Sequence, residues 1–141
     1  MQAIPYLGFD GRCAEAFRFY AGILGGEIRA LMTHGESPAA GEVPASWHHL
    51  VVHAHLVAGD AQLMGGDQPS DFDGPPQGMC VNLVVDSVEE SERIYAALAA
   101  GGRVTMPMET TFWAERFAML VDRFGTPWII NSATTPAAGG S

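Results

Sequence analysis

The chain has 141 residues, 48% of them hydrophobic, which is enough for one compact domain with a buried core. Its 16 acidic residues outnumber the 7 basic ones, which gives a formal net charge of −9. A chain this acidic lacks the Lys and Arg clusters that phosphate backbones and anionic lipids require, so nucleic-acid and membrane partners are excluded.

The first half of the chain predicts a strand, a helix and three more strands. The apolar residues of the helix follow a 3.6-residue period: Cys13, Phe17, Tyr20 and Leu24. Asp10 is placed to cap the start of this helix, and Gly25-Gly26 to end it. The expected elements are a strand at 4–9, a helix at 12–24, a strand at 27–32, a loop at 33–46, and strands at 47–57 and 61–64.

The second half repeats this order after a segment rich in Pro, Asp and Gly. Ser87 and Glu90 form a predicted capping box at the start of a helix that is expected to bury Val88, Tyr95 and Leu98. The expected elements are a strand at 80–85, a helix from 87 to about 99, and strands at 103–108, 117–121 and 127–130.

These elements predict one domain over residues 1–132, made of two modules at about 1–66 and 79–132. The linker at 67–78 is expected to be solvated, with Asp67 among its acidic residues, and the tail at 133–141 is expected to be frayed.

A constant offset relates the two modules. Asp10 and Asp86 are 76 positions apart, and so are Gly25 and Gly101. Two landmarks with one spacing indicate a duplicated strand–helix unit, and two copies of one unit commonly build a functional site between their facing surfaces. The duplication therefore predicts a cleft between the modules.

Several short motifs extend over almost the whole chain. They are Phe19-Tyr20 with Leu24-Gly25-Gly26, Val52-His53-Ala54, Leu63-Met64-Gly65, Thr111-Phe112-Trp113 and the run Asp-Arg-Phe-Gly-Thr-Pro-Trp at 122–128. With these motifs the chain resembles the PhnB-like branch of the vicinal oxygen chelate superfamily, which includes glyoxalase I, extradiol dioxygenases and bleomycin-resistance proteins. The resemblance implies an α+β fold in which two βαβββ modules form a cupped mixed sheet, and it implies a homodimer.

Metal-dependent members of that superfamily hold a divalent ion with His and Glu from four sheet positions. Carried onto this sequence, these positions fall near Pro5-Tyr6, within 62–64, on Cys80 and near Ile129, and none holds a His or a Glu. We therefore predict no cofactor and no metal at these positions. A divalent metal is otherwise conceivable only at His53 and His55, which alternate onto one strand face together with His49. The alternative is that one histidine is interior and hydrogen-bonded and that the others are exposed or lie at a subunit contact.

Two residues are candidates for acid–base chemistry, His53 and Glu109. Glu109 stands one position earlier than the acid that relatives carry before their Thr-Phe-Trp run, and in an extended segment this shift would turn it to the other strand face. The alternative is a surface Glu on a loop. Tyr6, Trp113 and Trp128 are predicted to line an aromatic pocket. Core packing is the alternative for at least one of these three.

The sequence predicts a protein that binds or acts on a small molecule in the cleft between the modules, without the usual metal site. The alternative is a metal-dependent lyase or dioxygenase that uses His53 and neighbouring residues. Enzymatic and purely ligand-binding roles both remain open. Cys13 and Cys80 have no paired spacing and are expected to be buried free thiols. The start of the chain lacks a secretion-signal pattern, so we expect a cytoplasmic protein.

Overall fold

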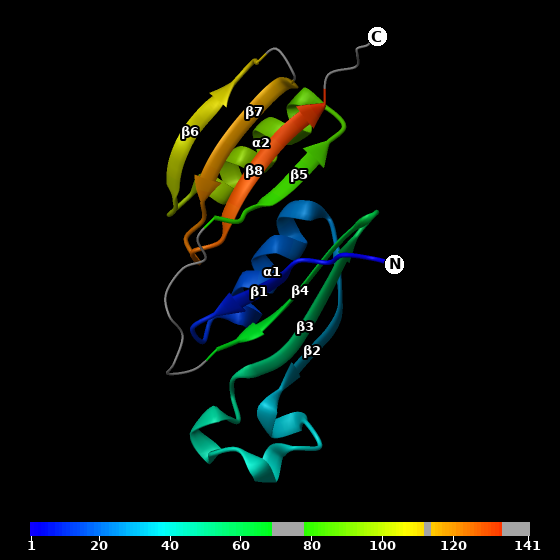
Figure 1. Cartoon of the computed structure of the whole chain (residues 1–141), viewed down its shortest axis with the longest axis vertical. Coiled ribbons are helices and arrows are strands. Elements are labelled where there is room, and N and C mark those ends of the chain that lie inside the picture. The colour runs from blue at the N-terminus through cyan, green and yellow to red at the C-terminus, as the bar shows by residue number, and fades with distance from the viewer. Residues whose placement is uncertain (69–77, 112–113, 134–141) are drawn as a thin grey trace. The chain divides into compact units, whose positions relative to one another are not determined.

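The computed structural model describes residues 1–68, 78–111 and 114–133. The chain divides into two compact units, unit 1 (Met1–Gly74) and unit 2 (Pro75–Ser141), shown in Figure 1. Unit 1 contains β1 (Tyr6–Phe9), α1 (Cys13–Leu24), β2 (Glu27–Thr33), three 3₁₀ turns (His34–Glu36, Ala40–Glu42 and Ala45–Trp47), β3 (Val51–Ala58) and β4 (Ala61–Asp67). Unit 2 contains β5 (Val81–Val85), α2 (Val88–Ala99), β6 (Arg103–Glu109), β7 (Ala114–Val121) and β8 (Pro127–Ala133).

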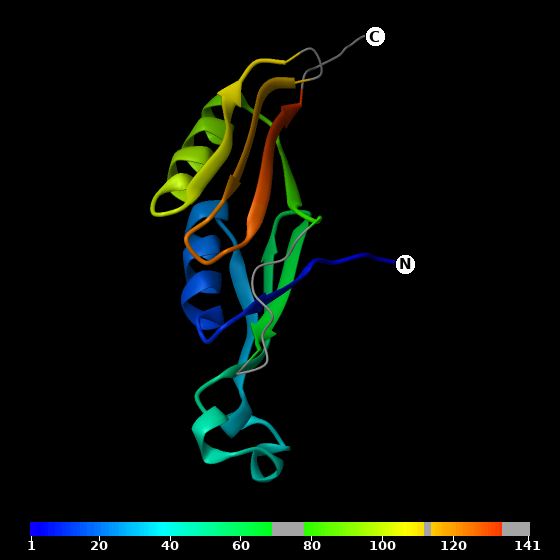
Figure 2. The same ribbon diagram turned by 60° about the vertical axis from the view of Figure 1, so that its left-hand side comes forward.

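Each unit is built on a four-stranded mixed sheet. The strand orders are β1-β4-β3-β2 in unit 1 and β5-β8-β7-β6 in unit 2. In each sheet the first strand pairs in parallel with the last, and the other pairs are antiparallel. Figure 2 shows α1 lying along one face of its sheet, and α2 along one face of its own. The predicted α+β fold with two βαβββ modules is confirmed.

The offset of 76 positions holds to within one residue for the first three elements of each unit. The first residues of β2 and β6 are 76 positions apart, and so are their last residues. Gly25 and Gly101 both have a positive φ, of 66° and 76°. β3 and β7, however, begin only 63 positions apart, because residues 34–50 separate β2 from β3 while 110–113 separate β6 from β7. The longer segment holds the three 3₁₀ turns, so the two copies have diverged between their second and third strands.

Helix α1 begins with a cap that comes from far along the sequence. One carboxylate oxygen of Asp67 accepts hydrogen bonds from the backbone N–H groups of Gly11 and Cys13, both at 2.9 Å. The other oxygen accepts from the backbone N–H of Val51 at 2.8 Å. The predicted cap, Asp10, lies on the surface 3.9 Å from Arg12. The capping role of Asp10 and the solvated linker role of Asp67 were therefore wrong, since β4 continues to Asp67 and its carboxylate joins α1, β3 and β4.

The other helix signals were mostly correct. Gly25 ends α1 in the left-handed conformation, and the Ser87 side chain accepts from the Glu90 backbone N–H at 3.1 Å. The return half of the capping box is absent from the described contacts, because the Glu90 carboxylate binds Arg93 at 2.7 Å instead. The buried residues of α2 are Ser91, Ile94 and Leu98, so the predicted burial of Val88 and Tyr95 was wrong.

The core of unit 1 lies between α1 and its sheet. Phe9, Phe17 and Tyr20 are buried there with ring centroids 6.1 to 6.5 Å apart, and the rings of Phe9 and Phe17 meet edge to face. This confirms the predicted apolar stripe of α1 apart from Leu24, which is half-buried while its neighbour Ile23 is buried. No helix among the described residues is long and apolar enough to span a membrane.

Candidate functional site

The face of the unit 1 sheet that turns away from α1 is called here the open face. Ala54, Leu56 and Leu63 turn toward α1 and are buried. Because side chains alternate along a strand, their sequence neighbours turn the other way, and paired residues share a face. The open face therefore carries Tyr6 from β1, Met32 from β2, His53 and His55 from β3, and Gln62 and Met64 from β4.

Tyr6 lies across the open face. It pairs with Met64 in the parallel β1–β4 register, and its hydroxyl donates to the Val52 carbonyl oxygen at 3.3 Å. A Cβ atom on Gly66 would come within 2.9 Å of this hydroxyl, so the glycine leaves the space in which the phenol lies. The residue is 56% exposed, yet burial of the hydroxyl end and the nearby Cys13 raise the pKa of the Tyr6 phenol. The phenol is therefore neutral near pH 7.

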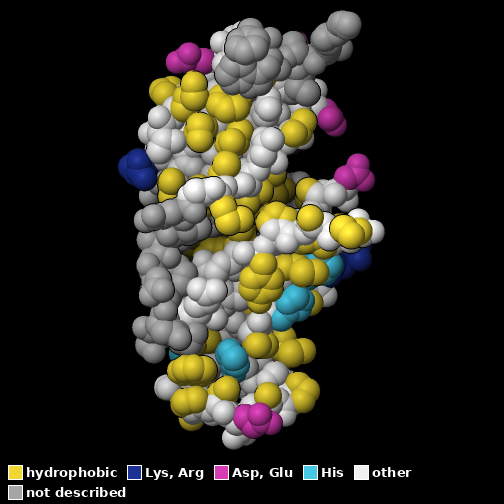
Figure 3. Space-filling model, in the orientation of Figure 1, with side chains coloured by type: hydrophobic (Ala, Val, Ile, Leu, Met, Phe, Trp, Pro, Cys, Tyr) yellow, Lys and Arg dark blue, Asp and Glu magenta, His cyan; other side chains and the backbone are white. Residues whose placement is uncertain are grey.

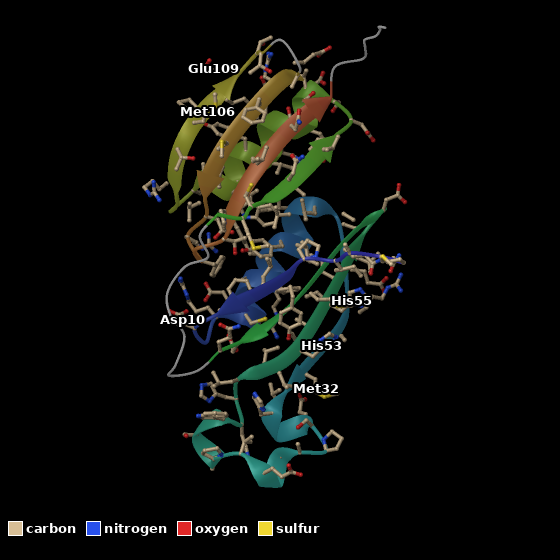
Figure 4. The ribbon with its side chains drawn as sticks, viewed as in Figure 1. Asp10, Met32, His53, His55, Met106 and Glu109 are labelled. Atoms are coloured by element: carbon tan, nitrogen blue, oxygen red, sulfur yellow. The ribbon has the colours of Figure 1, made fainter. Side chains whose placement is uncertain are left out.

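His55 is oriented by a neighbouring amide. Its Nε2 lies 2.8 Å from Oε1 of Gln62. A carbonyl oxygen can only accept, so Nε2 donates the hydrogen in this contact, and in the neutral imidazole the lone pair is then on Nδ1. His53 lies two residues earlier on the same strand, opposite Met32 on β2. Figure 4 shows Met32, His53 and His55 in succession along β2 and β3, and Figure 3 shows histidine side chains next to hydrophobic ones on the viewed surface of unit 1.

The predicted histidine strand is shorter than expected. His53 and His55 share one face, as predicted. β3 begins only at Val51, however, so His48 and His49 lie outside it, and the strand predicted at 47–57 was wrong over its first four residues. The segment before β3 turns because Ala45–Trp47 is a 3₁₀ turn, and Nε2 of His48 lies 2.9 Å from the Ala40 carbonyl oxygen.

The remaining candidate residues belong to unit 2. Glu109 is exposed at the end of β6, opposite Phe117, and Figure 4 shows it there. Trp128 is only 1% exposed, and its ring N–H donates to Asp122 at 2.8 Å. Trp128 is thus a core residue of unit 2, in line with the expectation that at least one of the three aromatic residues packs inside. Trp113 lies outside the described residues.

The two cysteines occupy different environments. Cys13 is buried, as expected, and burial together with the charge of Asp67 raises the pKa of its thiol to about 12. Cys80 is exposed, which corrects the expectation that both thiols are buried. It directly precedes β5, so its side chain is not enclosed by the sheet and helix of unit 2.

We expect iodoacetamide at pH 8 to label one thiol per native chain, because the raised pKa and burial of Cys13 keep it protonated and covered. Mass spectrometry should place the label on Cys80 and find none on a Cys80→Ser variant. In urea both thiols of the parent should react. Fast labelling of native Cys13 would contradict this prediction.

The raised pKa of the Cys13 thiol also makes the stability of the folded chain depend on pH. The pKa of Cys13 is higher in the folded chain than in the unfolded one, so the unfolded thiol ionises first as the pH rises. The contribution of the protonated Cys13 thiol to the free energy of unfolding is fully present below the ordinary thiol pKa. This contribution is lost as the pH rises from that pKa to about 12.

The described residues contain no group of three or more His, Cys, Asp or Glu side chains placed to hold a metal ion. The open face offers instead one phenol, two imidazoles, one amide and two thioethers, spread over four adjacent strands. This set can stack against an apolar molecule and form a few hydrogen bonds with it.

Tandem βαβββ units with mixed four-stranded sheets define a class of glyoxalase-fold proteins. The model of the Glyoxalase/Bleomycin resistance protein/Dioxygenase superfamily matches residues 5–130, and the chain belongs to this superfamily. The chain is 35% identical to Protein YjdN of Escherichia coli (strain K12), over 93% of this chain and 95% of that protein.

Two solved structures share the fold over nearly their full length. Protein PA1353 from Pseudomonas aeruginosa has a TM-score of 0.86 and 42% identity, with 94% of this chain and 98% of that chain covered. A Bacillus cereus protein described as a putative 3-demethylubiquinone-9 3-methyltransferase, PhnB protein, has a TM-score of 0.76 and 23% identity, with 94% and 100% covered. The resemblance to this superfamily predicted from the sequence is confirmed, and the Bacillus cereus PhnB protein shares the fold.

Proposed function

We propose that this protein binds a small, planar organic molecule on the open face of unit 1, without the four-ligand metal site of the metal-dependent superfamily members. One observation carries the proposal. The exposed ring of Tyr6, fixed by its hydrogen bond to Val52, lies beside Met64 on the neighbouring strand. The His55–Gln62 pair completes the surface on the same face.

These side chains suit a planar ligand for separate physical reasons. An aromatic ring gives a rigid apolar surface at low entropic cost, and a thioether is polarizable and adapts to the shape of its partner. The Nδ1 lone pair of His55 and the amide nitrogen of Gln62 supply an acceptor and a donor that fix the orientation of a bound molecule.

The other predictions about function remain predictions. Acid–base roles for His53 and Glu109 would need both residues at one site, and they come from different units. The cleft between the modules, the homodimer and the cytoplasmic location also stay proposals. The alternative of a metal-dependent lyase or dioxygenase is less supported, because the described residues give His53 no group of hard or borderline ligands.

We expect a Tyr6→Ala variant to bind 8-anilinonaphthalene-1-sulfonate about tenfold more weakly than the parent chain, because a stacking surface worth about 1.4 kcal/mol is lost. Fluorescence titration measures the affinity. Tyr95→Ala is the matched control, since Tyr95 lies on α2 in unit 2, and it should bind like the parent.

Circular dichroism should show that both variants are folded. Absence of probe binding by the parent, or equal weakening by the two substitutions, would contradict the proposed site.

A further inference from the structure

We propose that the open face of unit 1 binds a soft monovalent metal ion, copper(I) or its analogue silver(I). The donors are the imidazoles of His53 and His55 and the thioethers of Met32 and Met64. This inference goes beyond the proposed function because its central donors, His53 and Met32, are not part of the Tyr6 surface.

The register of the sheet brings these donors together. His53 and His55 are two residues apart on β3, about 6.7 Å along the strand, and they point to the same face. Met32 lies directly opposite His53 on β2, and Met64 directly opposite His55 on β4. Side chains directly opposite in antiparallel pairs have Cβ atoms about 4.5–5.5 Å apart. Two imidazoles are therefore flanked by one thioether on each side.

The hydrogen bond of His55 favours a ligand role. Histidines that bind metals usually donate their second ring N–H to an oxygen, which fixes both the ring and the tautomer. The 2.8 Å contact between Nε2 of His55 and Oε1 of Gln62 has this form, and it leaves Nδ1 for a metal ion. Gln62 is then a positioning residue for the site.

The chemistry of the donors selects the ion. All four are neutral, and two are thioethers, which prefer copper(I) to zinc, magnesium or manganese. In the described part of the chain, no third His, Cys, Asp or Glu joins the imidazole pair. The further ligands available are the two thioethers, and these bind soft ions such as copper(I). The net charge of −9 favours cations near the surface in general, and the half-buried imidazoles and 41% exposed Met32 remain reachable from solvent.

The test uses the full chain with Cys80→Ser, because the exposed Cys80 thiol is itself a soft-metal ligand. Copper(I), kept reduced with ascorbate, is titrated in competition with bicinchoninate. We expect one copper(I) per chain, and at least tenfold weaker binding after His53→Ala or Met32→Leu. The matched controls His49→Ala and Met79→Leu change residues that are exposed outside the sheets and should leave the affinity unchanged.

A second measurement reports on the thioethers directly. Silver(I) should shift the methyl carbon signals of Met32 and Met64 in NMR spectra of methyl-labelled protein and leave that of Met79 in place. Parent-like copper affinity in Met32→Leu, tighter binding of zinc than of copper(I), or equal losses in the controls would overturn the proposal. Tyr6→Ala should retain copper(I) while it loses the fluorescent probe, so failure of either proposal is distinguishable from failure of the other.

Discussion

Replacing Asp67 with Asn should lower the free energy of unfolding by about 3 kcal/mol. Asp67 accepts three backbone N–H groups, two at the start of α1 and one from Val51. An asparagine keeps one oxygen and places an NH₂ group against a backbone donor, so at least one partly buried N–H loses its acceptor. Urea denaturation followed by circular dichroism measures the change.

Asp10→Asn provides the matched control. Asp10 stands at the position that the sequence favours for a cap, but it is exposed and lies 3.9 Å from Arg12. Surface ion pairs contribute little, so its substitution should leave the urea midpoint almost unchanged. Equal effects of the two substitutions would show that the Asp67 carboxylate is not the cap of α1.

Gly65→Ala should cost about 3 kcal/mol of folding stability, because the new methyl group has no room on the α1 side of β4. Its Cβ would lie 2.6 Å from the Leu7 carbonyl oxygen and 2.9 Å from the Phe17 ring. The first neighbour is backbone in the paired strand, so β1 and β4 would have to separate locally. Thermal unfolding of the variant and the parent measures the loss.

Gly22→Ala is the control of opposite sign. Gly22 is exposed within α1, and a Cβ there would meet nothing within 4 Å. Alanine in a helix interior is favoured over glycine by about 0.5–1 kcal/mol, so this variant should be more stable than the parent. Destabilisation by both alanines would contradict the steric explanation at Gly65.

The sequence predicted what depends on neighbouring residues. The helix stripe at Cys13, Phe17 and Tyr20, the stop at Gly25 and the cap at Ser87 all involve residues within a few turns of each other. The cap of α1 could not be found in this way, because Asp67 is 54 positions from the N–H of Cys13. Its local setting, next to a segment rich in Pro, Asp and Gly, favoured a solvated loop instead.

The candidate site was predicted in part for the same reason. Alternation along one strand correctly placed His53 and His55 on one face. Met32 was missed because its position opposite His53 depends on the register of β2 against β3, which the residues of one strand do not reveal. Trp128 packs in the core, and its ring N–H donates to Asp122, which directly follows β7 and lies six positions earlier in the chain.

The strand order has a consequence for how the chain reaches its fold. Among the residues that the structure describes, the first strand of each unit pairs only with the last one, so β1 cannot pair before β4 is made, nor β5 before β8. During synthesis the β2–β3 and β6–β7 hairpins can close early, while β1 and β5 keep unpaired edges until their units are complete. Asp67, the last residue of β4, then joins α1 to the sheet only when unit 1 is almost fully made. Closure of each unit is thus a late, cooperative step, and a nascent chain that ends before β4 would expose the apolar side of α1.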